Sequence, residues 1–262
     1  MSPHNPNTRT RAASVLTEGV GKLSPDRRRH RGAHPEDARL FEAARLASLR
    51  VAVSELSWLL SRGYQTKSAL KIVGDRHNLT ERQRLAVSRA ACADESRARR
   101  LARRVDEHDV AGEGLIVDGF NLVILLEAAL SGGVLVLGRD GCVRDLSSVH
   151  GSYRAVEETE RAILLAGEAL AALAPGSVLW LLDSPVSNSG RLAARVREVA
   201  AERGWPWEVR VEFNPDRDIV NSNLVAVTSD SNVLDGVSRW LNLGRMIVER
   251  HVERPWVIDL SE

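Results

Sequence analysis

Three aspartates each close a short apolar run, in LIVD at Asp118, VLWLLD at Asp183 and LVAVTSD at Asp230. Burying an ionised carboxylate is unfavourable unless a partner or a cation compensates the charge. If the runs are parallel strands, their carboxyl ends meet at one edge of the sheet, where open α/β sheets bind ligands. One such aspartate is usually a helix cap. Three repelling carboxylates favour a divalent cation, so we predict these aspartates as catalytic and metal-binding residues.

Further acids lie near the three strand ends. Asp235, about one helical turn beyond Asp230, is predicted as an additional metal ligand. Asp216 and Asp218, in NPDRDIVNSN, precede the strand that leads to Asp230. No cluster of Cys and His accompanies these acids, so the expected ion is Mg²⁺ or Mn²⁺ rather than a soft metal.

The loop DSPVSNSGR follows the second strand and precedes a predicted helix. Backbone amides at a helix N-terminus, together with hydroxyl groups, suit a phosphate, although a plain capping loop explains this stretch equally well. Two further residues, in the segment GSYR, could reach a phosphate or stack on a base. The predicted substrate-binding residues are Asn121, Ser187, Asn188, Ser189, Arg191, Tyr153 and Arg154.

The elements that must position these residues alternate between strands and helices over residues 111–262. Apolar strands separated by helices predict a mostly parallel sheet covered on both faces, and GRDG predicts a hairpin turn. Gly119, directly after Asp118, is expected to let the chain turn closely from the strand into the helix. The predicted strands are 115–118, 134–137, 141–145, 178–182, 207–213, 224–228 and 256–260, and the predicted helices are 121–130, 157–173, 190–203 and 232–241.

The preceding region, residues 35–110, has the apolar spacing of helices and is predicted as a small all-α domain. Gly63 ends its first long helix, a short helix covers 67–73, and Thr80 with Gln83 forms a capping box at the start of another. Residues 1–34 have few apolar side chains and are predicted as a disordered basic tail.

Charge is divided unevenly along the 262 residues. Residues 1–110 hold 22 Lys and Arg against 13 Asp and Glu, whereas the remainder holds 14 against 22. A basic half beside an acidic half is typical of a polyanion-binding module joined to a carboxylate-rich one, although two solvated faces are the plainer alternative. No apolar run is long enough to span a membrane, and the two cysteines form no CxxC pair. We therefore expect a cytoplasmic protein without a membrane partner.

The motifs VDGFN, LLDSPVSNSG and VTSDSNVLD, in this order, resemble the PIN-like nuclease fold. The C-terminal half resembles the family called domain of unknown function 5616, and LLSRGYQTKSALKIVGDRHNLTERQRLAVSRAAC resembles domain of unknown function 434. Together the resemblances cover about residues 38–260. They imply metal-binding acids at Asp118 and Asp230, with Asn121 nearby, and Asp183 resembles a strand-end aspartate of NYN-type nucleases. For the acid that a helix supplies in PIN nucleases, Glu127, Glu157 and Glu158 compete.

The expected function is metal-dependent hydrolysis of RNA phosphodiester bonds, with RNA held by the basic helical part. An RNA-binding protein with a degenerate PIN-like domain is the first alternative, and a metal-dependent phosphatase is the second. A dinucleotide-binding enzyme is disfavoured because no GxGxxG follows the first strand. The sequence is compatible with a homo-oligomer.

Overall fold

The computed structural model describes residues 30–147 and 153–262. The predicted tail therefore lies outside the described residues except for its last five positions. The N-terminal helical part confirms the predicted helices, and the side chains of Thr80 and Gln83 form both bonds of the capping box. Its elements are α1 (Asp37–Leu40), α2 (Ala43–Leu60), α3 (Thr66–Arg76), α4 (Glu81–Ala90), α5 (Asp94–Arg103) and the short 3-10 helix η1 (Glu107–Asp109).

The remainder is an α/β region with a five-stranded, entirely parallel sheet in the order β5-β4-β1-β6-β7, so the predicted α/β fold class is confirmed. From β1 the chain moves outward through β4 to β5 and then returns to β6 on the other side of β1. The strands of this sheet are β1 (Gly114–Asp118), β4 (Ser177–Asp183), β5 (Trp207–Glu212), β6 (Val225–Val227) and β7 (Trp240–Leu241).

Helices cover both faces of this sheet because its strands are apolar on both sides. Leu115 and Val117 of β1 point into the larger core, which the helices α6 (Gly119–Leu130), α7 (Thr159–Ala172), α8 (Ser189–Arg203) and α11 (Leu243–His251) complete. Ile116, between them, points into a smaller core with the short helices α9 (Pro215–Val220) and α10 (Ser231–Gly236).

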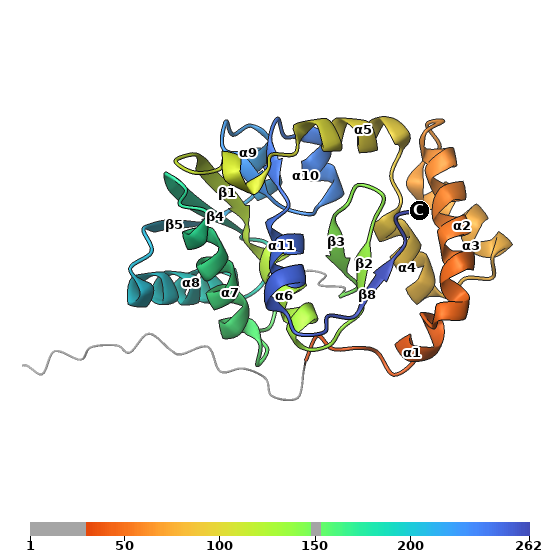
Figure 1. The fold of residues 1–262 in the computed structure, drawn as a ribbon, viewed down its shortest axis with the longest axis horizontal. Coiled ribbons are helices and arrows are strands. Elements are labelled where there is room, and N and C mark those ends of the chain that lie inside the picture. The colour runs from red at the N-terminus through yellow and green to blue at the C-terminus, as the bar shows by residue number, and fades with distance from the viewer. Residues whose placement is uncertain (1–29, 148–152) are drawn as a thin grey trace, which may run out of the picture.

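A second sheet, in the order β3-β2-β8, lies between the main sheet and α2–α4 (Figure 1). The predicted hairpin across GRDG is confirmed, since β2 (Leu135–Leu137) pairs antiparallel with β3 (Val143–Asp145). The last strand, β8 (Val257–Asp259), pairs with β2 and not with the main sheet. Val136 and Ile258 of this sheet are buried in one core with residues of α2 and α4. The helical and α/β parts therefore share a core across the predicted boundary at residue 110.

One predicted helix differs from the structure, and two helices of the structure were not predicted. The helix expected at 232–241 ends at Gly236, and Trp240 instead lies in the edge strand β7, where its indole donates to the carbonyl of Arg100 at 2.7 Å. The helices α9 and α11 were not predicted; α9 has only six residues, whereas Leu243, Met246 and Ile247 of α11 do have helical spacing. Within the described residues, none of the helices combines the length and apolarity needed to cross a bilayer.

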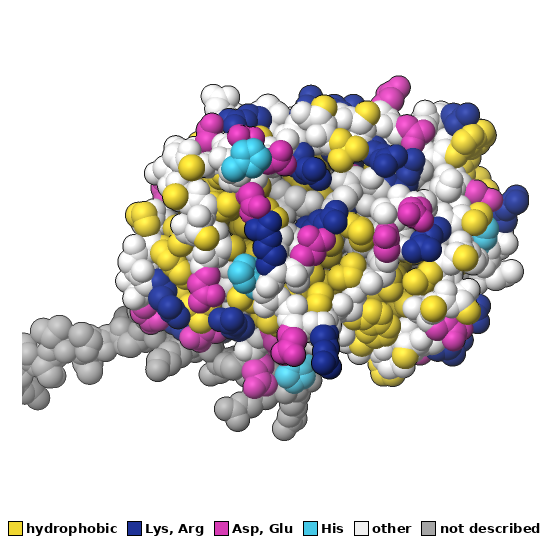
Figure 2. Space-filling model, viewed as in Figure 1, with side chains coloured by type: hydrophobic (Ala, Val, Ile, Leu, Met, Phe, Trp, Pro, Cys, Tyr) yellow, Lys and Arg dark blue, Asp and Glu magenta, His cyan; other side chains and the backbone are white. Residues whose placement is uncertain are grey.

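Many arginines of the helical part form ion pairs inside the protein. Arg82 pairs with buried Asp37, and Arg100 pairs with Asp140 and Asp235 of the α/β region. Figure 2 shows basic and acidic side chains interspersed over the face in view. The uneven charge along the sequence is thus partly compensated by contacts between the two halves.

Candidate metal and phosphate site at the sheet edge

The three strand-end aspartates lie at the same edge of the main sheet, because the strands that carry them are parallel. Asp118 is the last residue of β1, Asp183 is the last residue of β4, and Asp230 follows β6 by three residues. Strand order reverses at β1, between β4 and β6, and ligands in open α/β sheets bind at such a reversal.

A cavity of about 190 Å³ opens at this edge. Its acidic lining residues are Asp118, Asp183 and Asp216, the last of which lies in the first turn of α9. Its apolar lining residues are Phe120, Ile124, Val186 and Pro215. Asp230 is close enough for its charge to raise the pKa of both Asp118 and Asp216. Three acids therefore line the cavity and Asp230 lies near them; Asp216 was only a secondary candidate in the sequence.

Asp118 is the most perturbed of these acids. Burial, with the charge of Asp230 as a smaller contribution, raises its pKa from 3.8 to about 7. Two hydrogen bonds act in the opposite direction, from the hydroxyl of Thr228 to Oδ2 at 2.8 Å and from the amide of Asn121 to Oδ1 at 3.3 Å. The second bond is a helix cap, so Asp118 caps α6 and also lines the cavity.

The other carboxylates differ in what they contact. Burial raises the pKa of Asp183, and burial together with Asp230 and Asp183 raises that of Asp216. Across residues 30–147 and 153–262, no hydrogen bond reaches either side chain. Asp230 caps α10, because its Oδ1 accepts from the amides of Asn232 and Val233 at 2.8 and 3.2 Å. Asp183 and Asp216 thus remain available to a ligand.

Asn121 has a role inside the protein. Its side-chain oxygen accepts from the amide and the hydroxyl of Ser229, at 2.8 and 3.0 Å, and so ties α6 to the loop that carries Asp230. The two bonds from Ser229 occupy the side-chain oxygen of Asn121. The predicted contact of Asn121 with substrate stays a prediction.

The predicted phosphate-binding residues of the loop after β4 differ in their exposure to solvent. Ser187 and Arg191 are exposed, whereas Ser189 is buried at the start of α8. The side-chain amide of Asn188 donates to the carbonyl of Tyr153 at 2.7 Å. These contacts fix the loop against the segment that begins at residue 153.

Tyr153 itself is only 1% exposed, and its hydroxyl donates to Glu127 at 2.5 Å. Base stacking on Tyr153 would therefore require a rearrangement, whereas its neighbour Arg154 is exposed. Glu127 is fully buried and is paired with Arg31, which also lies 5.1 Å from the centre of the Tyr153 ring. Glu127 thus belongs to a buried ion pair and does not line the cavity.

The remaining candidate acids lie elsewhere. Asp235 accepts hydrogen bonds from Arg100 at 2.9 and 2.8 Å, so its carboxylate is neutralised by a guanidinium and is not among the acids that line the cavity. Asp218 lines a different surface hollow, together with Arg210 and Glu212, although it shares α9 with Asp216. The two acids of this short helix therefore face different hollows.

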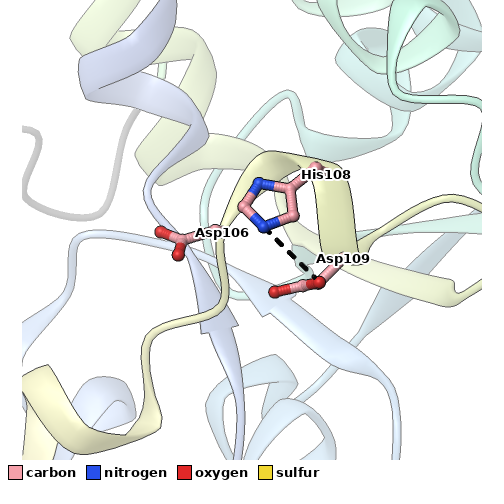
Figure 3. Close-up of side chains that lie close together, drawn as sticks. All are labelled: Asp106, His108 and Asp109. Carbon is pink, nitrogen blue, oxygen red and sulfur yellow. Dashed lines mark ion pairs between the residues drawn. The ribbon is translucent and has the colours of Figure 1, made fainter.

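A separate group that the sequence analysis missed lies around η1 (Figure 3). Asp106, His108 and Asp109 offer ligand atoms that lie within 4.8 Å of one another, and no other group of three described residues does so. All three side chains are exposed, and the group precedes β1, at the end of the sheet opposite to Asp118. The aspartates around the cavity are more widely spaced than this group.

Comparison with known proteins identifies the family. Residues 107–246 match "Domain of unknown function (DUF5616)", and residues 48–103 match "Protein of unknown function (DUF434)". The chain belongs to the DUF5616 family. A relative, the uncharacterized protein MJ0935 of Methanocaldococcus jannaschii, is 33% identical over 187 residues, which are 71% of this chain and 89% of the relative. No solved structure matches the chain. These matches confirm the predicted resemblance to domain of unknown function 434 followed by domain of unknown function 5616.

Proposed function

We propose that this DUF5616 chain is a divalent-metal-dependent phosphodiesterase that hydrolyses RNA and has a PIN-like arrangement of acidic strand ends. The observation that carries the proposal is the cavity at the reversal of strand order, lined by Asp118, Asp183 and Asp216. Carboxylate oxygens are the ligands that Mg²⁺ and Mn²⁺ prefer. A water occupies about 30 Å³, so a cavity of about 190 Å³ has room for an ion that keeps several waters.

In this proposal Asp118, Asp183 and Asp216 hold the ion in part through waters that it keeps, because their oxygens are too widely spaced to ligate one ion all directly, and Asp230 adds negative charge beside them. A bound Mg²⁺ or Mn²⁺ supplies activation of water and neutralises charge on the scissile phosphate. Thr228 orients Asp118 through its hydrogen bond to Oδ2. Asp183 and Asp216, whose side chains accept no hydrogen bond in the described part of the chain, are the carboxylates available to accept one from the attacking water.

RNA is favoured over a small phosphate ester by an exposed aromatic side chain that is close in sequence to a residue lining the cavity. Phe213 follows β5, is 81% exposed and lies two residues before Pro215, which lines the cavity. Exposed aromatic rings next to a phosphate site stack on unpaired bases. Arg191, exposed in the first turn of α8, and Arg154 offer positive charge for the phosphate backbone.

The test uses the full chain with structured RNA, single-stranded RNA and a phosphomonoester, each in Mn²⁺, in Mg²⁺ and in EDTA. We expect cleavage of RNA that needs the metal and falls about 100-fold or more in Asp118→Asn and Asp216→Asn, as for other groups that stabilise charge in the transition state. Asp218→Asn is the matched control, because it alters the same helix on the side away from the cavity. It should keep wild-type activity.

Three results would count against the proposal. RNA binding without cleavage in either metal supports the degenerate domain. Turnover of the phosphomonoester alone supports a phosphatase. Equal loss in Asp216→Asn and Asp218→Asn would show that these changes act through the fold of α9 and not through the cavity.

A further inference from the structure

The loop between β6 and α10, which carries Asp230, is held by two arginines through its backbone. Nε of Arg144 donates to the carbonyl of Ser229 at 2.7 Å. A terminal nitrogen of Arg100 donates to the carbonyl of Ser231 at 3.0 Å. The two carbonyls belong to the residues immediately before and after Asp230, so the arginines hold Asp230 from both sides in sequence.

The two arginines are themselves held by a shared carboxylate. Asp140 accepts from Arg144 at 2.9 and 2.7 Å and from Arg100 at 2.6 Å. The three side chains are between 1% and 4% exposed. Arg100 also makes two hydrogen bonds to Asp235. Buried charges in such a network are confined to one geometry, because breaking any contact leaves a charge without a partner.

The same loop is also tied to β1 and α6. Oγ1 of Thr228 donates to Asp118 at 2.8 Å and accepts from the amide of Asp230 at 3.0 Å. The amide of Ser229 donates to Asn121 at 2.8 Å. Thr228 therefore links the two aspartates, while the arginines determine where the loop lies relative to it.

We propose that Arg100 and Arg144 are positioning residues that hold Asp230 beside the cavity, and that α5 of the helical part thereby completes the site. The functional part of this inference rests on the proposed function. Arg144 comes from β3, but Arg100 comes from α5, within the segment that matches DUF434. Figure 1 shows α5 crossing from the helical part to α10. The helical part thus contributes to the geometry of the site through contacts inside the protein.

The experiment compares Arg100→Gln with Arg103→Gln in the full chain. Arg103 lies on the same helix and donates to the carbonyls of Asp235 and Val237, so it docks α5 on α10 without contacting residues 229–231. Hydrogen exchange is measured at the amides of Asn232 and Val233, which donate to Asp230 and so report its position. Mn²⁺ affinity and RNA cleavage are measured alongside. Arg100→Lys, which keeps the charge with fewer donors, serves if the glutamine variant does not fold.

We expect Arg100→Gln to speed exchange at these two amides by about tenfold or more and to weaken Mn²⁺ binding by a similar factor, with Arg103→Gln close to wild type at both. Arg100→Lys should lie between them. Equal effects of the two glutamine variants, or unchanged exchange in Arg100→Gln, would overturn the positioning role. If wild type neither binds Mn²⁺ nor cleaves RNA, the proposed function fails, while the exchange data still decide whether Arg100 holds the loop.

Discussion

Replacing Asp118 by Asn should stabilise the metal-free protein above neutral pH. Burial raises the pKa of Asp118 from 3.8 to about 7, so the folded protein binds this proton more tightly than the unfolded chain does. Stability therefore falls as pH rises from about 4 to 7 and is lowest, with respect to this group, above pH 7. Asn cannot ionise, and its single side-chain oxygen can still accept from the amide of Asn121, so it caps a helix about as well as Asp, while its NH2 group can donate to Oγ1 of Thr228.

The expected size follows from the same pKa. One pKa unit corresponds to about 1.4 kcal/mol, so the rise to about 7 corresponds to about 4 kcal/mol. Asp118 keeps partial contact with solvent, which reduces the effect, and we expect Asp118→Asn to raise the free energy of unfolding at pH 8 by about 2–4 kcal/mol. The gain should shrink as pH falls towards 3.8, because the carboxyl of the unfolded chain then becomes protonated as well.

Urea denaturation in EDTA at pH 4.5 and pH 8 measures this difference. Asp218→Asn is the control. Its free energy of unfolding should match that of wild type at both pH values, because Asp218 lines a surface hollow other than the cavity of Asp118. Mn²⁺ should stabilise wild type at pH 8 in proportion to its binding and should leave Asp118→Asn nearly unchanged. A variant that is less stable than wild type at pH 8 in EDTA would refute the reasoning and would make Asp118 a helix cap only.

Three further predictions concern the fold around the site. Arg31→Ala leaves the buried carboxylate of Glu127 without its cation and should lower the free energy of unfolding by about 3–5 kcal/mol, measured by denaturation at pH 7; a loss below 1 kcal/mol would contradict the pairing. In Gly119→Ala the new Cβ would lie 2.8 Å from the carbonyl oxygen of Leu181, so we expect a cost of about 1–3 kcal/mol and reduced Mn²⁺ binding, with an unchanged melting temperature as the contrary result. The isolated fragment 35–110 should show no cooperative thermal transition by circular dichroism, because it shares its core with β2 and β8; a sharp transition would show that it folds alone.

Much of the fold could be predicted because local signals agree with it. The apolar runs ending in aspartate, the capping box at Thr80 and the GRDG turn each act within a few residues, and the structure confirms the elements they predict. Parallel pairing then places Asp118, Asp183 and Asp230 at one edge. The short elements α9 and β7 were missed because their formation depends on burial against the sheet rather than on a repeating pattern.

The sequence by itself determined which strands end in an aspartate. It also determined that these aspartates lie at one edge of the sheet, because the strands run in the same direction. Which acids share the cavity was decided by tertiary structure. Asp216 lines the cavity and Asp235 does not, although both are acids near Asp230 in sequence. The guanidinium of Arg100, from α5, binds the carboxylate of Asp235 instead. Partners of this kind, like Arg31 for Glu127, are separated by about a hundred residues or more, so no local pattern records them.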